Sequence, residues 1–203
     1  MRNRTTSHLL RESVTLGQLI GLDKEESYYG LHPGEEDYRR RTFWFLYVTE
    51  RGHAMQNSIS TCLTNSIKLP SPSYNIQDHV FDGFHKLLRL FKSMDDGILC
   101  PAVCNRIITD QGYREKLCHV HRELRQQTHW PAKCNETQKA DISITQQWLR
   151  ILVWQLSLRN ISMSSDPGDD IMSLTYPIHV ARDALHYTSA LSLPALVAQG
   201  LEW

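Results

Sequence analysis

The side chains best suited to chemistry are four potential metal ligands in the middle of the chain. Cys100 and Cys104 are separated by three residues that include a proline, and Cys118 and His121 follow them. Zinc binds four thiolate or imidazole ligands, and Cys118 and His121 would share one face of a helix, whereas His119 would not. The alternative is that the cysteines are buried thiols and the histidines lie at the surface. A metal-dependent helical enzyme is one hypothesis, and a purely structural role for these residues is the other.

No motif for catalysis accompanies the ten histidines of the chain. The sequence lacks a nucleophile elbow, a glycine-rich phosphate loop and the His-Glu-x-x-His pattern. The carboxylates between Asp166 and Asp170 lack the alternating spacing of a calcium loop, so we interpret that segment as a turn. We therefore predict that the chain is not an enzyme, and we assign it no catalytic, metal-binding or DNA-binding residue and no cofactor.

A run of acids precedes a run of arginines near one predicted helix start: Glu35, Glu36 and Asp37, then Arg39, Arg40 and Arg41. Consecutive helical residues point about 100° apart, so the three arginines cannot form one phosphate-binding patch alone. Each arginine instead follows an acid by four residues, which predicts ion pairs along the helix. Glu50 and Arg51 lie farther along the same helix, and if that part is buried their charges must be paired.

The overall composition favours one soluble globular domain over residues 1–203. Lys and Arg together number 22, as do Asp and Glu, so the formal net charge is zero. This balance argues against a surface that itself binds nucleic acid. No apolar run reaches the roughly 18–20 residues of a membrane helix. Five scattered cysteines without a secretory signal favour reduced thiols in the cytosol or nucleus.

Apolar periodicity predicts an all-α fold, a layered multi-helix domain with no segment of strand-like alternation. We expect helices at about 7–20, 34–57, 76–94, 109–127, 142–161 and 177–192, with a helical restart at Pro194. Two of them should be the largely buried centre of the layers: 34–57, and 142–161. The first has an apolar middle on all sides and should be buried all round, with Trp44 and Phe45 in the core. In the second, Trp148 and Trp154 belong to the core or line a small-molecule pocket.

Three segments carry a resemblance to a known family. Residues 39–56 read RRRTFWFLYVTERGHAMQ, residues 10–22 read LRESVTLGQLIGL, and residues 141–156 read DISITQQWLRILVWQL. The first resembles the arginine-led helix of the middle homology region in fungal binuclear zinc-cluster transcription factors. The second resembles the helix that precedes it there, and the third resembles a helix of the amylolytic and maltose-responsive subgroup. The likeness covers residues from about 7 to 200.

The resemblance implies an all-helical regulatory domain of a nuclear protein, which responds to protein partners or to a small-molecule inducer. In this family DNA is read by an N-terminal six-cysteine zinc cluster, which this sequence does not contain. DNA contact is therefore expected only through a domain that is not present here, and the family zinc has no ligands in this chain. The domain looks clipped at both ends relative to the family, and after Gln56 the chain departs from the basic turn of the subgroup.

The resemblance also selects residues that should be structural members of the motif helices. These are Arg39, Arg40, Arg41, Phe43, Trp44, Glu50, Arg51, Gln147, Trp148, Leu149 and Arg150. The leading hypothesis is a regulatory domain of a fungal transcription factor that controls carbohydrate-use genes. The alternatives are a stand-alone helical module that binds a metabolite or protein, and a truncated remnant without function.

Overall fold

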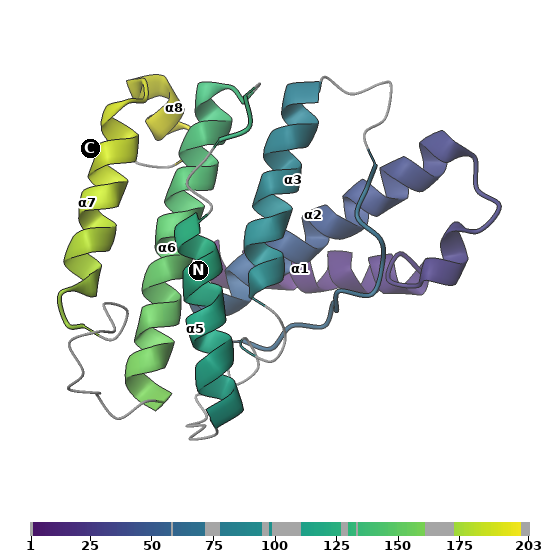
Figure 1. The fold of residues 1–203 in the computed structure, drawn as a ribbon. Helices are drawn as coiled ribbons and strands as arrows, with labels where there is room; N and C mark the ends of the chain where they lie inside the picture. Colours follow the sequence, from purple (N-terminus) through teal and green to yellow (C-terminus); the bar gives the residue numbers. More distant parts are fainter. Residues whose placement is uncertain are drawn as a thin grey trace. The chain divides into compact units, whose positions relative to one another are not determined.

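The computed structural model describes residues 2–57, 59–71, 78–94, 98, 111–126, 130–132, 134–160 and 173–199. All regular structure in these ranges is helical and none is a strand, which confirms the predicted all-α class (Figure 1). The chain divides into two compact units. The first comprises residues 1–76 and 95–106, and the second comprises residues 77–94 and 107–203. The single domain expected over residues 1–203 stays a prediction, and each unit is described by itself.

The first unit contains two long antiparallel helices, α1 (Arg2–Leu19) and α2 (Pro33–Asn57), with the short 3₁₀ helix η1 (Glu25–Tyr28) between them (Figure 1). Gly17 lets the helices approach closely, because a Cβ there would lie 3.3 Å from Leu46 Cδ1. Near the other ends, Ser7 Oγ lies 3.0 Å from His53 Nε2.

Gly21 ends α1, as the sequence predicted. Its backbone has a φ of +74°, which glycine adopts without steric cost. The N–H of Gly21 bonds to Gln18 O, and the N–H of Leu22 bonds to Gly17 O. This pair of bonds is a Schellman motif, which satisfies carbonyls that the helix end would otherwise leave unpaired.

The buried side of α2 is a single stripe. Its buried residues are Arg40, Phe43, Trp44, Tyr47, Glu50, Arg51 and Ala54. This spacing places them on one face of a helix. Phe45 lies on the opposite face and its side chain is 64% exposed, so the predictions that Phe45 anchors the core and that the helix is buried all round are wrong. A helix with apolar residues all round can be buried on every side only where neighbouring elements pack against each side, and none packs over Phe45 among the described residues.

The second unit is built around α6 (Glu136–Asn160), which contacts four other helices. These are α3 (Asp78–Ser93), α5 (Gln111–Gln126), α7 (Tyr176–Ser189) and α8 (Leu193–Val197). Central placement explains why α6 buries residues on more than one face: Leu149 and Val153 lie on one face, and Ala140 and Gln147 lie on the other. The prediction of a strongly buried helix here is therefore confirmed.

The start of α6 lies at Glu136 and not near residue 142, where the sequence placed it. The N–H of Gln138 donates to Asn135 Oδ1 at 2.9 Å, and the N–H of Asn135 donates to Gln138 Oε1 at 3.2 Å. This reciprocal capping box satisfies two backbone donors and lengthens the helix into a polar stretch that the sequence analysis took for a loop.

Within the described ranges, every helix is too short or too polar to cross a membrane.

Candidate functional site

The candidate site lies in the first unit, where residues 59–71 form an irregular segment, here called the strap, that runs along α2. The strap contains no helix or strand. Its residues Cys62 and Leu63 bond to Glu50 and Arg51, whereas its Lys68 bonds to Arg40 and Trp44, which come earlier in α2. The strap therefore runs antiparallel to the helix, and two groups of side chains from α2 and η1 hold it.

The first group, called the first clamp, consists of Glu50 and Arg51. The Glu50 carboxylate accepts the N–H of Cys62 at 2.8 Å and the N–H of Leu63 at 2.9 Å, one on each oxygen. Arg51 Nη1 donates to the carbonyl oxygen of Leu63 at 3.0 Å. The Arg51 guanidinium also stacks 3.4 Å above the centre of the Tyr47 ring. Both charged residues are buried, so these charge-assisted bonds replace the water that each group loses.

Arg11 on α1 adds a second positive charge at the first clamp. Its Nη1 lies 3.6 Å from Glu50 Oε1 and contacts Cys62 Sγ, and its Nη2 donates to Ser60 O at 3.1 Å. The expectation that the charges of Glu50 and Arg51 have partners is confirmed: Glu50 binds two strap N–H groups and lies beside Arg11, and Arg51 binds a strap carbonyl and stacks on Tyr47. The two residues fix the position of the strap as well as the register of the helix.

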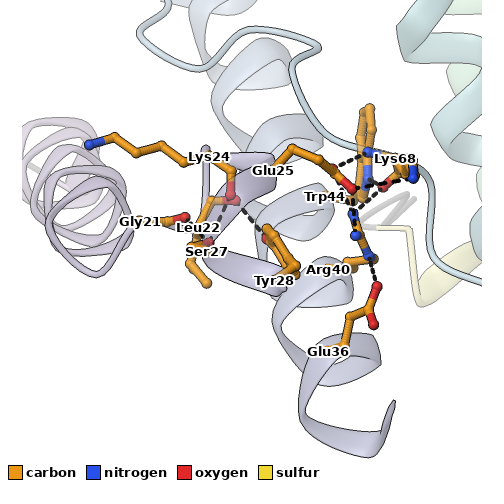
Figure 2. Close-up of polar contacts among 10 residues, drawn as sticks. All are labelled: Gly21, Leu22, Lys24, Glu25, Ser27, Tyr28, Glu36, Arg40, Trp44 and Lys68. Atoms are coloured by element: carbon orange, nitrogen blue, oxygen red, sulfur yellow. Dashed lines mark hydrogen bonds and ion pairs between the residues drawn. The ribbon is translucent and has the colours of Figure 1, made fainter. Parts of the chain in front are cut away.

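The second clamp consists of Glu25, Arg40 and Trp44 around the backbone N–H and carbonyl of Lys68 (Figure 2). Trp44 Nε1 donates to Lys68 O at 3.0 Å, and Glu25 Oε2 accepts the N–H of Lys68 at 3.0 Å. Arg40 donates to both oxygens of Glu25, at 2.7 and 3.0 Å, and its Nε donates to Glu36 at 2.9 Å. A bidentate arginine–carboxylate pair thus orients the carboxylate that binds the strap.

Electrostatics at the second clamp favour the charged forms of its acid and base. The hydrogen bond from Arg40 is the main cause that lowers the pKa of Glu25 to about 2, against an opposing effect of desolvation. The same contact raises the pKa of Arg40. The Arg40 guanidinium also lies 4.2 Å above the centre of the Tyr28 ring, and burial raises the pKa of Tyr28 to about 12. Tyr28 in turn donates to Leu22 O at 2.6 Å, so η1 is fixed to the end of α1.

Apolar side chains of the strap complete the contact. Leu63 and Ile67 are buried, with 2% and 4% of their surfaces exposed, and Pro70 is buried as well. Thr64 and Asn65 between them are exposed. The strap is therefore held through its backbone and through three apolar side chains. Leu63 and Ile67 are four residues apart, and Ile67 and Pro70 are three residues apart.

The three arginines of the motif have different roles. Arg40 is buried in the second clamp, whereas Arg39 and Arg41 are partly exposed. Arg39 pairs with Glu35 at 2.7 Å and Arg41 pairs with Asp37 at 2.6 Å, and the bond from Arg40 to Glu36 completes the predicted i,i+4 set. Phe43 and Trp44 are fully buried and meet edge to face, with ring centres 5.4 Å apart.

A second polar cluster lies in the second unit and includes motif residues of α6. Arg150 donates to Gln147 Oε1 at 2.6 Å, to Asp183 Oδ2 at 2.6 Å and to Tyr176 Oη at 3.1 Å. Gln147 and Arg150 are buried, and so is Leu149. Trp148 is half-buried. The cluster joins α6 to α7.

His121 of α5 meets this cluster through the Tyr176 ring, with ring centres 5.3 Å apart. Its side chain is fully buried. Desolvation is the largest cause that lowers the pKa of His121 to about 3, and the positive charge of Arg150 adds to the effect. His121 is therefore a neutral side chain inside the unit at neutral pH, and not a surface histidine.

The candidate metal ligands are only partly described. Cys100 and Cys104 lie outside the described residues, and Cys118 is half-buried. Among the residues that the structure describes, no three His, Cys, Asp or Glu side chains come together as a metal site. The alternative hypothesis of a metal-dependent enzyme is therefore not tested by these residues.

Sequence reasoning missed the strap and Glu25. The strap contributes mainly backbone atoms, which every residue carries, so its sequence gives no signal for the contact. Glu25 stands 15 residues before Arg40, beyond the range of helical spacing rules. The one available signal was the requirement that Glu50 and Arg51 have partners if they are buried.

Curated relatives match nearly the whole chain. The probable sucrose utilization protein of Candida albicans is 26% identical over 94% of the chain and 38% of its own length. A maltose fermentation regulatory protein of Saccharomyces cerevisiae is 27% identical over 90% of the chain and 38% of its own length. The respiratory transcription factor of the same yeast is 26% identical over 92% of the chain and 40% of its own length.

These matches confirm the resemblance to fungal transcription regulators, with sugar-utilization proteins among the homologues. None of the three is named as an enzyme. The chain spans about two fifths of the length of these relatives. No protein-family model and no solved structure matches it.

Proposed function

We propose that this homologue of yeast sugar-utilization regulators is a regulatory region that controls transcription of carbohydrate-use genes. The observation that supports the proposal is the agreement between the matched relatives and the role of the motif residues. Arg40, Trp44, Glu50 and Arg51, which carry the resemblance, are the α2 residues that hold the strap. The motif thus maintains one defined packing of the first unit, which a regulatory domain needs if a signal is to change it.

In this proposal the chain acts by binding and not by catalysis, and it requires no cofactor of its own. Its partners are other proteins or a small-molecule inducer, and contact with DNA is made by a part of the protein outside this sequence. The site of action is the nucleus. The formal net charge of zero supports the assignment of DNA contact to another part of the protein, because a surface that binds DNA needs an excess of basic residues.

A reporter assay tests the proposal directly. The full chain is fused to the DNA-binding domain of a bacterial repressor and expressed in yeast with a reporter gene behind the matching operator. Reporter output is compared after growth on glucose, maltose and sucrose. We expect output that differs severalfold between at least one of the two disaccharides and glucose. The DNA-binding domain alone should give the same output on all three sugars.

Two matched variants connect the response to the site. Glu50→Gln should reduce the sugar response, because it removes an acceptor for the N–H of Leu63. Glu35→Gln affects only an ion pair at the surface of the same helix and should leave the response intact. A fusion that reaches the nucleus at normal levels and gives the output of the bare DNA-binding domain on every sugar contradicts the proposal.

A further inference from the structure

We propose that the strap is an internal ligand on a peptide-binding face of α2, and that a non-helical segment of a partner protein with the same apolar pattern displaces it. The proposal goes beyond transcriptional control, because it concerns what the face binds. It rests on the contacts between α2, η1 and residues 59–71 alone.

The first argument is that α2 and η1 recognise the backbone of the strap. Glu50 accepts two strap N–H groups, and Arg51 donates to a strap carbonyl. Glu25 and Trp44 bind the N–H and carbonyl of Lys68 in the same way. Because every residue except proline carries both groups, these side chains would bind any non-helical segment that can follow the bends of the strap at Asn65 and Ile67.

The second argument concerns the specificity of the face. Leu63, Ile67 and Pro70 point inward and are buried, whereas Thr64 and Asn65 are exposed. A competing segment must therefore place apolar residues at positions n, n+4 and n+7. It must also avoid proline at n−1, n and n+5, because the N–H groups of Cys62, Leu63 and Lys68 at those positions bind carboxylates.

The third argument is the order of hydrogen-bond donors and acceptors in the two clamps, which sets the direction of the bound segment. Each contains a buried or half-buried carboxylate that accepts N–H groups and a donor that binds a carbonyl oxygen. A segment that runs in the opposite direction would present its groups in a different order, so the face selects an antiparallel orientation. A non-helical peptide with these features is the occupant that the geometry favours over a helix, whose N–H groups are already bonded to its own carbonyls.

A synthetic peptide tests the proposal. The probe is a fluorescein-labelled peptide of residues 59–71, with serine in place of Cys62 to prevent oxidation. Its binding to the full chain is measured by fluorescence anisotropy. The strap of the protein is weakened by Leu63→Ala with Ile67→Ala, and the matched control carries Thr64→Ala with Asn65→Ala at exposed positions of the same segment.

The weakened strap should compete less, so the peptide should bind that variant at least tenfold more tightly than it binds the wild type or the control. Adding Glu50→Gln to the weakened variant should remove most of this gain. Equal affinity for all three proteins, or no saturable binding by a variant that circular dichroism shows to be folded, overturns the proposal.

A second measurement applies if the weakened variant does not fold. The wild-type chain is incubated with excess unlabelled peptide, and hydrogen exchange of its own strap is followed by mass spectrometry. Exchange at residues 62–68 should accelerate while exchange in the buried stripe of α2 stays slow. Unchanged strap exchange at saturating peptide concentration overturns the proposal, as does equal acceleration throughout the unit.

Discussion

The carboxylate of Glu50 accepts the backbone N–H of Leu63 at 2.9 Å, although the Glu50 side chain is almost fully buried. The two residues stand 13 positions apart, beyond the range of helical i,i+4 spacing. Burial of a charge is costly unless hydrogen bonds replace its water. The buried charge of Glu50 therefore requires the bond to Leu63. The same bond fixes the position of Leu63 against α2.

Glu50→Gln should destabilise the chain by about 1–3 kcal/mol, because the amide nitrogen that replaces one oxygen cannot accept an N–H bond. The free energy of unfolding is measured by urea titration. Glu35→Gln is the control and should change stability by less than about 0.5 kcal/mol, since its ion pair is exposed. Equal effects of the two changes would show that the Glu50 contacts contribute no more than a surface ion pair.

Trp44→Ala should cost about 3–5 kcal/mol, the range for deletion of a buried aromatic side chain. Trp44 is fully buried against Phe43 and Tyr47 and also donates to the strap. The neighbouring Phe45→Ala should change stability by less than about 0.5 kcal/mol, because Phe45 faces outward. Chemical melts of the two variants check the orientation of α2. A larger loss for Phe45→Ala would mean that the helix is rotated.

Protonation of His121 should destabilise the second unit at mildly acidic pH. Its pKa is about 3 in the folded state and about 6.5 when unfolded, so the unfolded chain binds the proton more readily between these values. The stabilisation is complete above pH 6.5 and is lost as pH falls towards 3. Between pH 7 and 4.5 this loss is on the order of 2 kcal/mol.

Urea melts of wild type and His121→Phe at pH 7 and pH 4.5 isolate this contribution. The variant should lose less stability than the wild type over the interval, because phenylalanine does not titrate. Glu25 contributes little in this interval, since its folded pKa of about 2 places its loss at pH values below 4.5. Parallel pH dependence of both proteins would show that His121 is not buried in its neutral form.

Asn135→Ala should destabilise the second unit by about 1 kcal/mol, because it removes the side-chain acceptor that caps α6. Circular dichroism melts of the full chain check the loss. Asn135→Asp keeps the acceptor at the positive end of the helix dipole and should retain most of the stability. Loss of stability in both variants would contradict a capping role.

How much of this fold the sequence determined depends on the range of the interactions involved. Gly21 as a helix stop and the acid–arginine pairs of α2 are local features, and both were predictable from spacing alone. The outward orientation of Phe45 was not predictable, because it depends on which face of α2 the strap and α1 cover. An apolar residue on an uncovered face looks the same in the sequence as one in the core.

The site shows the same limit. Trp44 and Arg40 were selected by the family resemblance, but their binding to Lys68 involves a carbonyl group that no side-chain pattern reveals. The capping box at Asn135 was readable in the sequence and was missed because the surrounding residues are polar. His121 was grouped with potential metal ligands, whereas the structure buries it on α5 against the ring of Tyr176 in α7.

Amide hydrogen exchange of the strap is the most direct test of the central claim that α2 holds residues 59–71 in a fixed place. The N–H groups of Cys62, Leu63 and Lys68 should exchange at least ~100-fold more slowly than in a free peptide, which corresponds to about 2.7 kcal/mol of opening free energy. Exchange of these amides at the rate of the free peptide, while α2 itself stays protected, would contradict the claim.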